Sequence, residues 1–189
     1  MIEAVRILLL LALAAAALTF AALASAWWFE AARRLRRAMR KVLGADPETE
    51  AVNPHQGVAA GIDFETASLA VLWDKGRSGL VYAFDEIEGA ELIVDGQVAA
   101  RTRRDEARRG LDTTAPEAEQ VTLRLVFADA RFPEFEVELW GPGPPGDLHS
   151  AAEAMRLGRR WLSHVEAILK RPPPPRDGET DLSVARSES

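Results

Sequence analysis

The stretch "GVAAGIDFETASLAVLWD", residues 57–74, decides how the chain folds. It holds two short apolar runs, residues 57–64 and 69–74, on either side of the polar turn "ETAS" at residues 65–68. Short apolar runs joined by a compact polar turn are typical of a β-hairpin. From this point the apolar spacing of three and four found earlier in the chain gives way to alternation, which favours strands.

Five further strands are predicted downstream of this hairpin. "LVYAF" spans residues 80–84, and "AELIVDGQVAARTR" spans residues 90–103 as a second hairpin turning at Asp95-Gly96. Asp-Gly is a strong turn signal, because both residues tolerate the positive φ angles of a tight turn. "QVTLRLVFAD", residues 120–129, and "EFEVELW", residues 134–140, alternate clearly. The pattern predicts seven strands with polar outer faces and one shared apolar inner face, in an antiparallel sheet bent into a sandwich or partial barrel.

A helix is predicted after the breaker "GPGPPGD", beginning near Leu148 with Asp147 as its N-cap. Its apolar stripe would cover the open end of the sheet, and Gly158 in its middle would allow a close approach. The four prolines at residues 172–175 end the helix, and the polar segment 172–189 is expected to be a disordered tail. The predicted fold class is therefore α+β, with a seven-stranded sheet capped by one C-terminal helix.

The N-terminal segment predicts a membrane anchor ahead of this domain. Residues 7–29 carry no charge, and 23 residues of helix would measure about 34 Å, enough to cross a bilayer core of about 30 Å. Cleavage after Ala26 within Ala24-Ser25-Ala26, which would release the domain to the periplasm or exterior, and a buried soluble helix are the alternatives. The preferred interpretation is a single transmembrane span, residues 1–29, in a bacterial inner membrane.

A basic segment follows the uncharged run and sets the expected topology. Positive charge on the C-terminal side of a span marks the cytoplasmic side, and tryptophans gather at the membrane boundary. Leu35, Met39, Val42 and Leu43 form an apolar stripe opposite the arginines, so the segment could lie on an anionic leaflet or stand as a solvated stalk. Residues 30–56 are interpreted as this helix and a linker, and residues 57–171 as the domain. The candidate interface residues are Trp27, Trp28, Arg33, Arg34, Arg36, Arg37, Arg40 and Lys41.

Composition excludes several classes of function. The chain has no cysteine, and its three histidines are far apart in sequence, so neither a thiol nucleophile nor a zinc site is indicated. Beyond residue 41 the chain carries 16 basic and 27 acidic side chains, a net charge of −11. An acidic body lacks the positive surface that nucleic acid requires. No cofactor and no metal are predicted.

No catalytic motif stands out. Glu134, Glu136 and Glu138 share one strand face, but outward-facing acids on a strand are typical of a solubilising surface. "GRSGL" around Ser78 lacks the strand–turn–helix context of a hydrolase, and no glycine-rich run ends in the Gly-Lys-Ser/Thr of a phosphate cradle. We therefore do not expect an enzyme, although a carboxylate enzyme would follow if Glu136 or Glu138 lay in a cleft.

The order of elements resembles a pleckstrin-homology (PH) domain, and the local sequence is similar to the bacterial PH-like family. The matching segments are "GIDFETASLAVLW", "YAFDEIEGAELIVDG", "LRLVFADARFPEFEVELW" and "RRWLSHVEAILKR", within residues 57–171. The resemblance implies a binding or assembly module, often attached to a membrane. PH domains that bind phosphoinositides are basic in the first hairpin, whereas this turn carries Glu65 and is followed by Asp74, so a phosphoinositide partner is disfavoured.

The sequence thus predicts a membrane-anchored PH-like module that binds another protein at the cytoplasmic face. Its oligomeric state is left open. A sensor for a small ligand or lipid, using the gap between sheet and helix, is the alternative. The residues expected to bind the partner are Leu80, Tyr82 and Phe84 on one sheet edge, with Trp140, and the loop from Arg104 to Glu119 is a second surface to consider.

Overall fold

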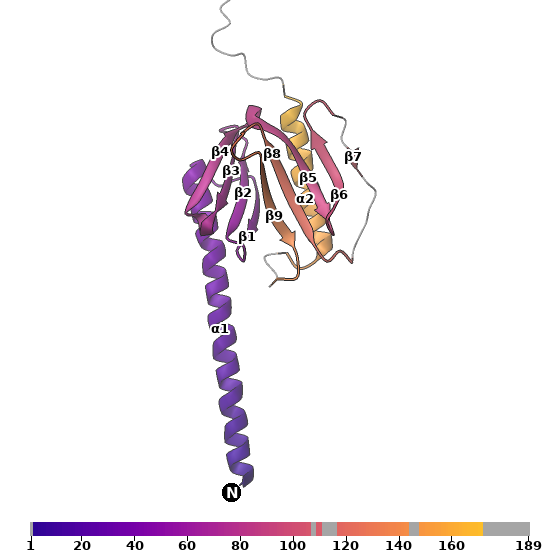
Figure 1. The fold of residues 1–189 in the computed structure, drawn as a ribbon. Coiled ribbons are helices and arrows are strands. Elements are labelled where there is room, and N and C mark those ends of the chain that lie inside the picture. The colour runs from indigo at the N-terminus through magenta and orange to yellow at the C-terminus, as the bar shows by residue number, and fades with distance from the viewer. Residues whose placement is uncertain (1, 107–108, 111–116, 144–147, 172–189) are drawn as a thin grey trace, which may run out of the picture.

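The computed structural model describes residues 2–106, 109–110, 117–143 and 148–171, apart from the side chains of residues 2–4, 8, 21–29 and 109. A long N-terminal helix leads into a β-rich domain that a second helix completes (Figure 1). The helices are α1 (Ile2–Leu43) and α2 (Ala151–Leu169), with short 3₁₀ turns η1 (Asp74–Gly76) and η2 (Phe84–Glu86). The strands are β1 (Thr49–Asn53), β2 (Val58–Asp63), β3 (Ser68–Trp73), β4 (Ser78–Ala83), β5 (Ile87–Val94), β6 (Gln97–Arg103), β7 (Arg109–Gly110), β8 (Val121–Phe127) and β9 (Glu134–Trp140).

The strands form two antiparallel sheets. The first has the order β1-β2-β3-β4, and the second has the order β7-β6-β5-β8-β9. The chain passes from the first sheet to the second through η2. The two sheets are also joined where β1 meets β9, because the side-chain amide of Asn53 donates to the carbonyl oxygen of Glu138 at 2.9 Å. This arrangement encloses a core between the sheets.

One large core unites both sheets and α2. The first sheet contributes Ile62, Leu69 and Val71, all almost completely buried. The face of the second sheet that carries Leu92 and Leu123 meets both these residues and the apolar stripe of α2. In Figure 1, α2 lies against the second sheet and α1 against the first. The two helices therefore cover different sheets.

The inner strands of the first sheet, β2 and β3, are buried on both faces. The residues that alternate with these core residues along the strands point the other way. Ala59, Ala70 and Leu72 pack against Leu35 and Met39 of α1 in a second, smaller core. Continuous apolar runs, in place of strict alternation, are what two-sided burial requires. The expectation that all outer faces would be polar is therefore wrong for this sheet.

Glycines in the first sheet and in the adjoining turn η1 let α1 lie close to them. A Cβ added at Gly61 would lie 3.0 Å from Sδ of Met39, and one at Gly76 would lie 2.9 Å from Cβ of Ala38. Gly76 also has a positive φ of 80°, which favours glycine. The apolar stripe predicted along residues 35–43 is thus occupied by the sheet, while Val42 remains exposed.

The predicted fold class is corrected in its number of strands and sheets. The seven predicted strands correspond to β2, β3, β4, β5, β6, β8 and β9, but the described residues form nine strands in two sheets. β1 lies inside the segment expected to be a linker, where it pairs along its full length with β2. The two-residue β7 pairs with β6 in the loop expected to be irregular.

The transmembrane helix of the predicted fold class is also corrected. Among the described residues, no helix combines the length and the hydropathy that crossing a bilayer requires. Residues 7–29 do not form a separate segment, because they belong to the 42-residue helix α1, which continues without a break into the part packed on the first sheet. Apolar side chains between Val5 and Phe20 are exposed along this helix.

The helix α2 begins three residues later than predicted. Its N-cap is Ser150, whose Oγ accepts from the Glu153 amide at 3.2 Å, and the Glu153 carboxylate accepts from the His149 amide in return. Asp147, the predicted N-cap, lies outside the described residues. The predicted close approach at Gly158 is confirmed, because a Cβ there would lie 2.3 Å from Cδ1 of Leu92.

Gly158→Ala is expected to destabilise the domain although alanine favours helix. The added methyl group collides with the buried Leu92, and overpacking of this kind costs about 1–3 kcal/mol, against about 1 kcal/mol gained in helix propensity. Urea denaturation followed by circular dichroism measures the difference. In a Leu92→Val background, which removes the colliding atom, the same substitution should cost less. An equal cost in both backgrounds would show that the contact is not the reason for the glycine.

Candidate functional site

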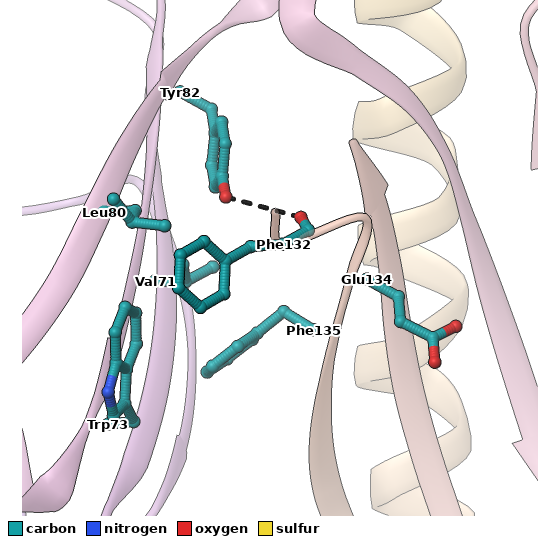
Figure 2. A pocket seen from close by; sticks show the side chains of 7 residues that line it. All are labelled: Val71, Trp73, Leu80, Tyr82, Phe132, Glu134 and Phe135. Atoms are coloured by element: carbon teal, nitrogen blue, oxygen red, sulfur yellow. Dashed lines mark hydrogen bonds between the residues drawn. The ribbon is translucent and has the colours of Figure 1, made fainter. Parts of the chain in front are cut away.

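Two of the four predicted partner-binding residues lie together in a surface hollow. Leu80 and Tyr82 alternate along β4 and point to the same side of the first sheet (Figure 2). Phe84 lies in η2 and packs edge-on against Phe64, with 5.8 Å between ring centroids. Trp140 is half-buried at the end of β9, opposite Val121. Of the four residues predicted to bind a partner, only Leu80 and Tyr82 therefore line the hollow.

The hollow has a volume of about 240 Å³ and lies between the first sheet and the connection from β8 to β9. Figure 2 shows β3 and β4 forming one wall, while the β8–β9 connection and the start of β9 form the other. We call it the aromatic hollow, and its lining residues are Val71, Trp73, Leu80, Tyr82, Phe132, Glu134 and Phe135.

Four of the seven lining residues are aromatic, and three of them lie close together. The centroid of Trp73 lies 5.8 Å from that of Phe132 and 6.5 Å from that of Phe135, within the range of favourable aromatic pairs. Phe132 is 47% exposed, so its ring presents apolar surface to solvent. Sequence reasoning missed Phe132, although an aromatic residue in a polar loop followed by proline was the available signal. Proline disfavours helical backbone for the preceding residue, which limits the conformations open to Phe132.

Tyr82 forms the inner end of the hollow. Its ring stacks on Phe127 with 3.9 Å between centroids, and its hydroxyl donates to Oδ2 of Asp129 at 3.4 Å. The backbone carbonyl of Phe132 lies 3.5 Å from the same hydroxyl, so the residue ties β4 to the β8–β9 connection. Burial, followed by the nearby Asp129 carboxylate, raises the pKa of Tyr82 to about 12. The hydroxyl is therefore a neutral donor at physiological pH.

The carboxylates of β9 are engaged in structural pairs. Arg124 on β8 binds Glu136 at 2.7 Å and lies 3.6 Å from Glu134, and Gln120 donates to Glu138 at 2.8 Å. A second hollow on this outer face of the second sheet, lined in part by Arg124 and Glu136, is open and polar. No group of three metal-binding side chains occurs among the described residues.

A buried glutamate organises the same outer face. Glu91 on β5 is 4% exposed, and its two oxygens accept from Arg103 at 2.8 Å and from Arg124 at 3.2 Å. Arg104 donates to the carbonyl of Ile87 at 2.6 Å, and Arg101 pairs with Glu106. The basic group formed by Arg101, Arg103 and Arg104 therefore holds strands and η2 together.

The predicted basic interface residues lie in the C-terminal third of α1. Arg36 pairs with Glu50 at 2.7 Å, Arg37 with Glu30 at 2.6 Å, and Arg40 with Asp46 at 2.5 Å. The remaining members, Arg33, Arg34 and Lys41, are exposed. The side chains of Trp27 and Trp28 lie outside the described residues. Binding of this set to an anionic surface stays a prediction.

The second surface considered, residues 104–119, is described only at residues 104–106, 109–110 and 117–119. Asp95 Oδ1 accepts from the amides of Glu119 and Gln120 at 2.9 Å, which fixes the return of this loop to β8.

Comparison of the chain with protein-family models, with curated proteins and with solved structures gave no match. The PH-like relationship therefore stays a prediction.

The raised pKa of Tyr82 can be measured directly, because it is the only tyrosine in the chain. Near-ultraviolet absorbance should show ionisation at about pH 12, compared with about pH 10 for an unfolded tyrosine. Between about pH 10 and about pH 12, the Tyr82 hydroxyl keeps its proton in the folded state and has lost it in the unfolded state. This contribution to stability is therefore complete below about pH 10 and is lost as the pH rises towards about 12.

Asp129→Asn serves as the control for this titration. It should lower the midpoint without returning it to the unfolded value, because burial is the larger cause of the shift. A midpoint near pH 10 while circular dichroism still reports a folded chain would contradict the described environment of Tyr82.

Proposed function

We propose that this protein is a binding module that takes a partner protein at the aromatic hollow. The observation that carries the proposal is the partly exposed aromatic surface of Phe132, Trp73 and Phe135 at the edge of a domain whose charge is otherwise strongly acidic. Aromatic side chains are enriched at the centres of protein interfaces, where a few of them supply most of the binding energy.

The chemistry around the hollow supports binding. The carboxylate of Glu134 points away from the hollow (Figure 2) and lies 3.6 Å from Arg124, while the hydroxyl in the lining, on Tyr82, is held protonated. A neutral phenol with a pKa of about 12 serves recognition better than proton transfer near neutral pH, because that pKa lies far from the working range.

A small-ligand site between the sheet and α2, the alternative considered from the sequence, is less well supported. Trp161, Leu162 and Val165 of α2 are fully buried in the common core, and Leu92 fills the space above Gly158. The aromatic hollow itself is smaller than the pockets of roughly 300–1,000 Å³ that hold most small ligands.

Photocrosslinking tests the proposal in cells that express the full chain. A benzophenone amino acid at position 132 should form an adduct with a defined protein, identified by mass spectrometry. Leu80→Ser in the same chain should reduce that adduct by about tenfold, because loss of a buried apolar contact costs roughly 1–2 kcal/mol.

The matched control carries the benzophenone at position 98, which is also an exposed apolar position but lies on the outer face of the second sheet. Identical adducts from positions 98 and 132, or an adduct at 132 that does not respond to Leu80→Ser, would contradict the proposal. Circular dichroism confirms that each variant is folded.

A further inference from the structure

The edge of the first sheet beside the aromatic hollow is unprotected. β4 is the last strand in the order β1-β2-β3-β4, and its sequence "SGLVYA" contains no charge and no proline. Its pairing with β3 runs through six residue pairs without a bulge. Proteins normally protect exposed edges with charges, prolines or bulges, because a free edge pairs readily with another strand.

The other described edges lack this combination. β1 and β9 carry glutamates and are joined at their corner by the Asn53–Glu138 hydrogen bond. β7 is two residues long. Among the described strands, β4 is thus the edge with both the length and the uncharged surface that a further strand would need.

The backbone groups that β4 directs outward can be assigned from its pairing. Phe84 donates its amide to the carbonyl of Ala67, and bonded pairs recur every second residue in an antiparallel ladder. The amides of Leu80 and Tyr82 therefore face β3, and those of Gly79 and Val81 face away from it. Val81 is 48% exposed. At the end of the strand the Ala83 amide is capped by the Glu86 carboxylate at 2.7 Å.

Side chains on an added strand would alternate in step with those of β4. Residues opposite Leu80 and Tyr82 would point to the same side as those two, which is the side of the aromatic hollow. The hollow of about 240 Å³ can accept one apolar side chain. Acidic groups lie at the Tyr82 end of the strand. Asp129 accepts from the Tyr82 hydroxyl and Glu86 caps Ala83, against Arg131 on the β8–β9 connection.

We infer that the partner is an extended segment of another protein that adds as a strand to β4, places an apolar side chain in the aromatic hollow and follows it with a basic residue. The inference rests on the proposed function and specifies the chemistry of its partner. Backbone bonds to Gly79 and Val81 supply affinity, while the hollow and its acidic border select the side chains.

Peptide selection against the full chain tests the inference. A phage library of random twelve-residue peptides is selected on the protein and depleted on Val81→Pro. This substitution removes an outward amide but no bond to β3, so the fold is retained. Enriched peptides should carry an apolar residue followed by lysine or arginine. One enriched peptide, labelled with fluorescein, should bind Val81→Pro at least about tenfold more weakly.

Further measurements on that peptide establish the mode of binding. Its addition should slow hydrogen exchange at the amides of Gly79 and Val81. Methylation of alternate peptide nitrogens should weaken binding in one register and leave it unchanged in the other. Val98→Pro, on β6, is the control variant and should bind as the wild-type chain does.

The outcomes separate this inference from the proposed function. If the protein crosslinked at position 132 is lost with Leu80→Ser but retained with Val81→Pro, the hollow binds protein and strand addition is wrong. Selection that yields no enriched peptide, or peptides indifferent to Val81→Pro, also overturns strand addition. If neither variant affects the crosslinked protein, both proposals fail.

Discussion

The burial of the β2–β3 hairpin on both faces is the constraint on which the rest of the structure depends. Ile62, Leu69 and Val71 fill the common core, while Ala59, Ala70 and Leu72 form a second apolar surface behind them. A sheet with two apolar faces is unstable in water unless both are covered. One side is covered by the second sheet and α2. The other side needs the C-terminal third of α1, which makes the helix part of the domain.

The local pattern of the sequence was enough to locate most of the elements. Strict alternation gave β8 and β9, and Asp95-Gly96 gave the β5–β6 turn. The prediction was wrong about how many faces of the β2–β3 hairpin are covered. Residues 58–62 and 69–73 read as continuous apolar runs, which is the pattern of a strand buried on both sides, yet only one covered face was inferred. Because the second covered face was overlooked, the apolar stripe of Leu35 and Met39 was expected to meet a membrane or solvent, although it packs on the first sheet. β1 was missed because five residues with little apolar content form a strand only through pairing with β2.

The candidate site was predictable only in the part that lies on one strand. Leu80 and Tyr82 alternate on β4, so local periodicity placed them on one face. Phe132 is 50 residues further along the chain and reaches them only because β8 and β9 pair in the other sheet. Single-sequence patterns carry no information on which loop meets which strand. The role of Glu91 was hidden for the same reason, since its two arginine partners come from β6 and β8.

The contact between α1 and the first sheet also determines how β4 is presented. Leu35, Met39 and Leu43 seat the helix on the sheet that ends in β4, and glycines remove the side chains that would hold the two apart. A 42-residue helix measures about 63 Å, several times the width of a sheet of four strands. Because one end is seated so closely, the orientation of the helix relative to the first sheet is fixed by that end. The direction of the helix axis and the side on which β4 is open are therefore set by one packing contact.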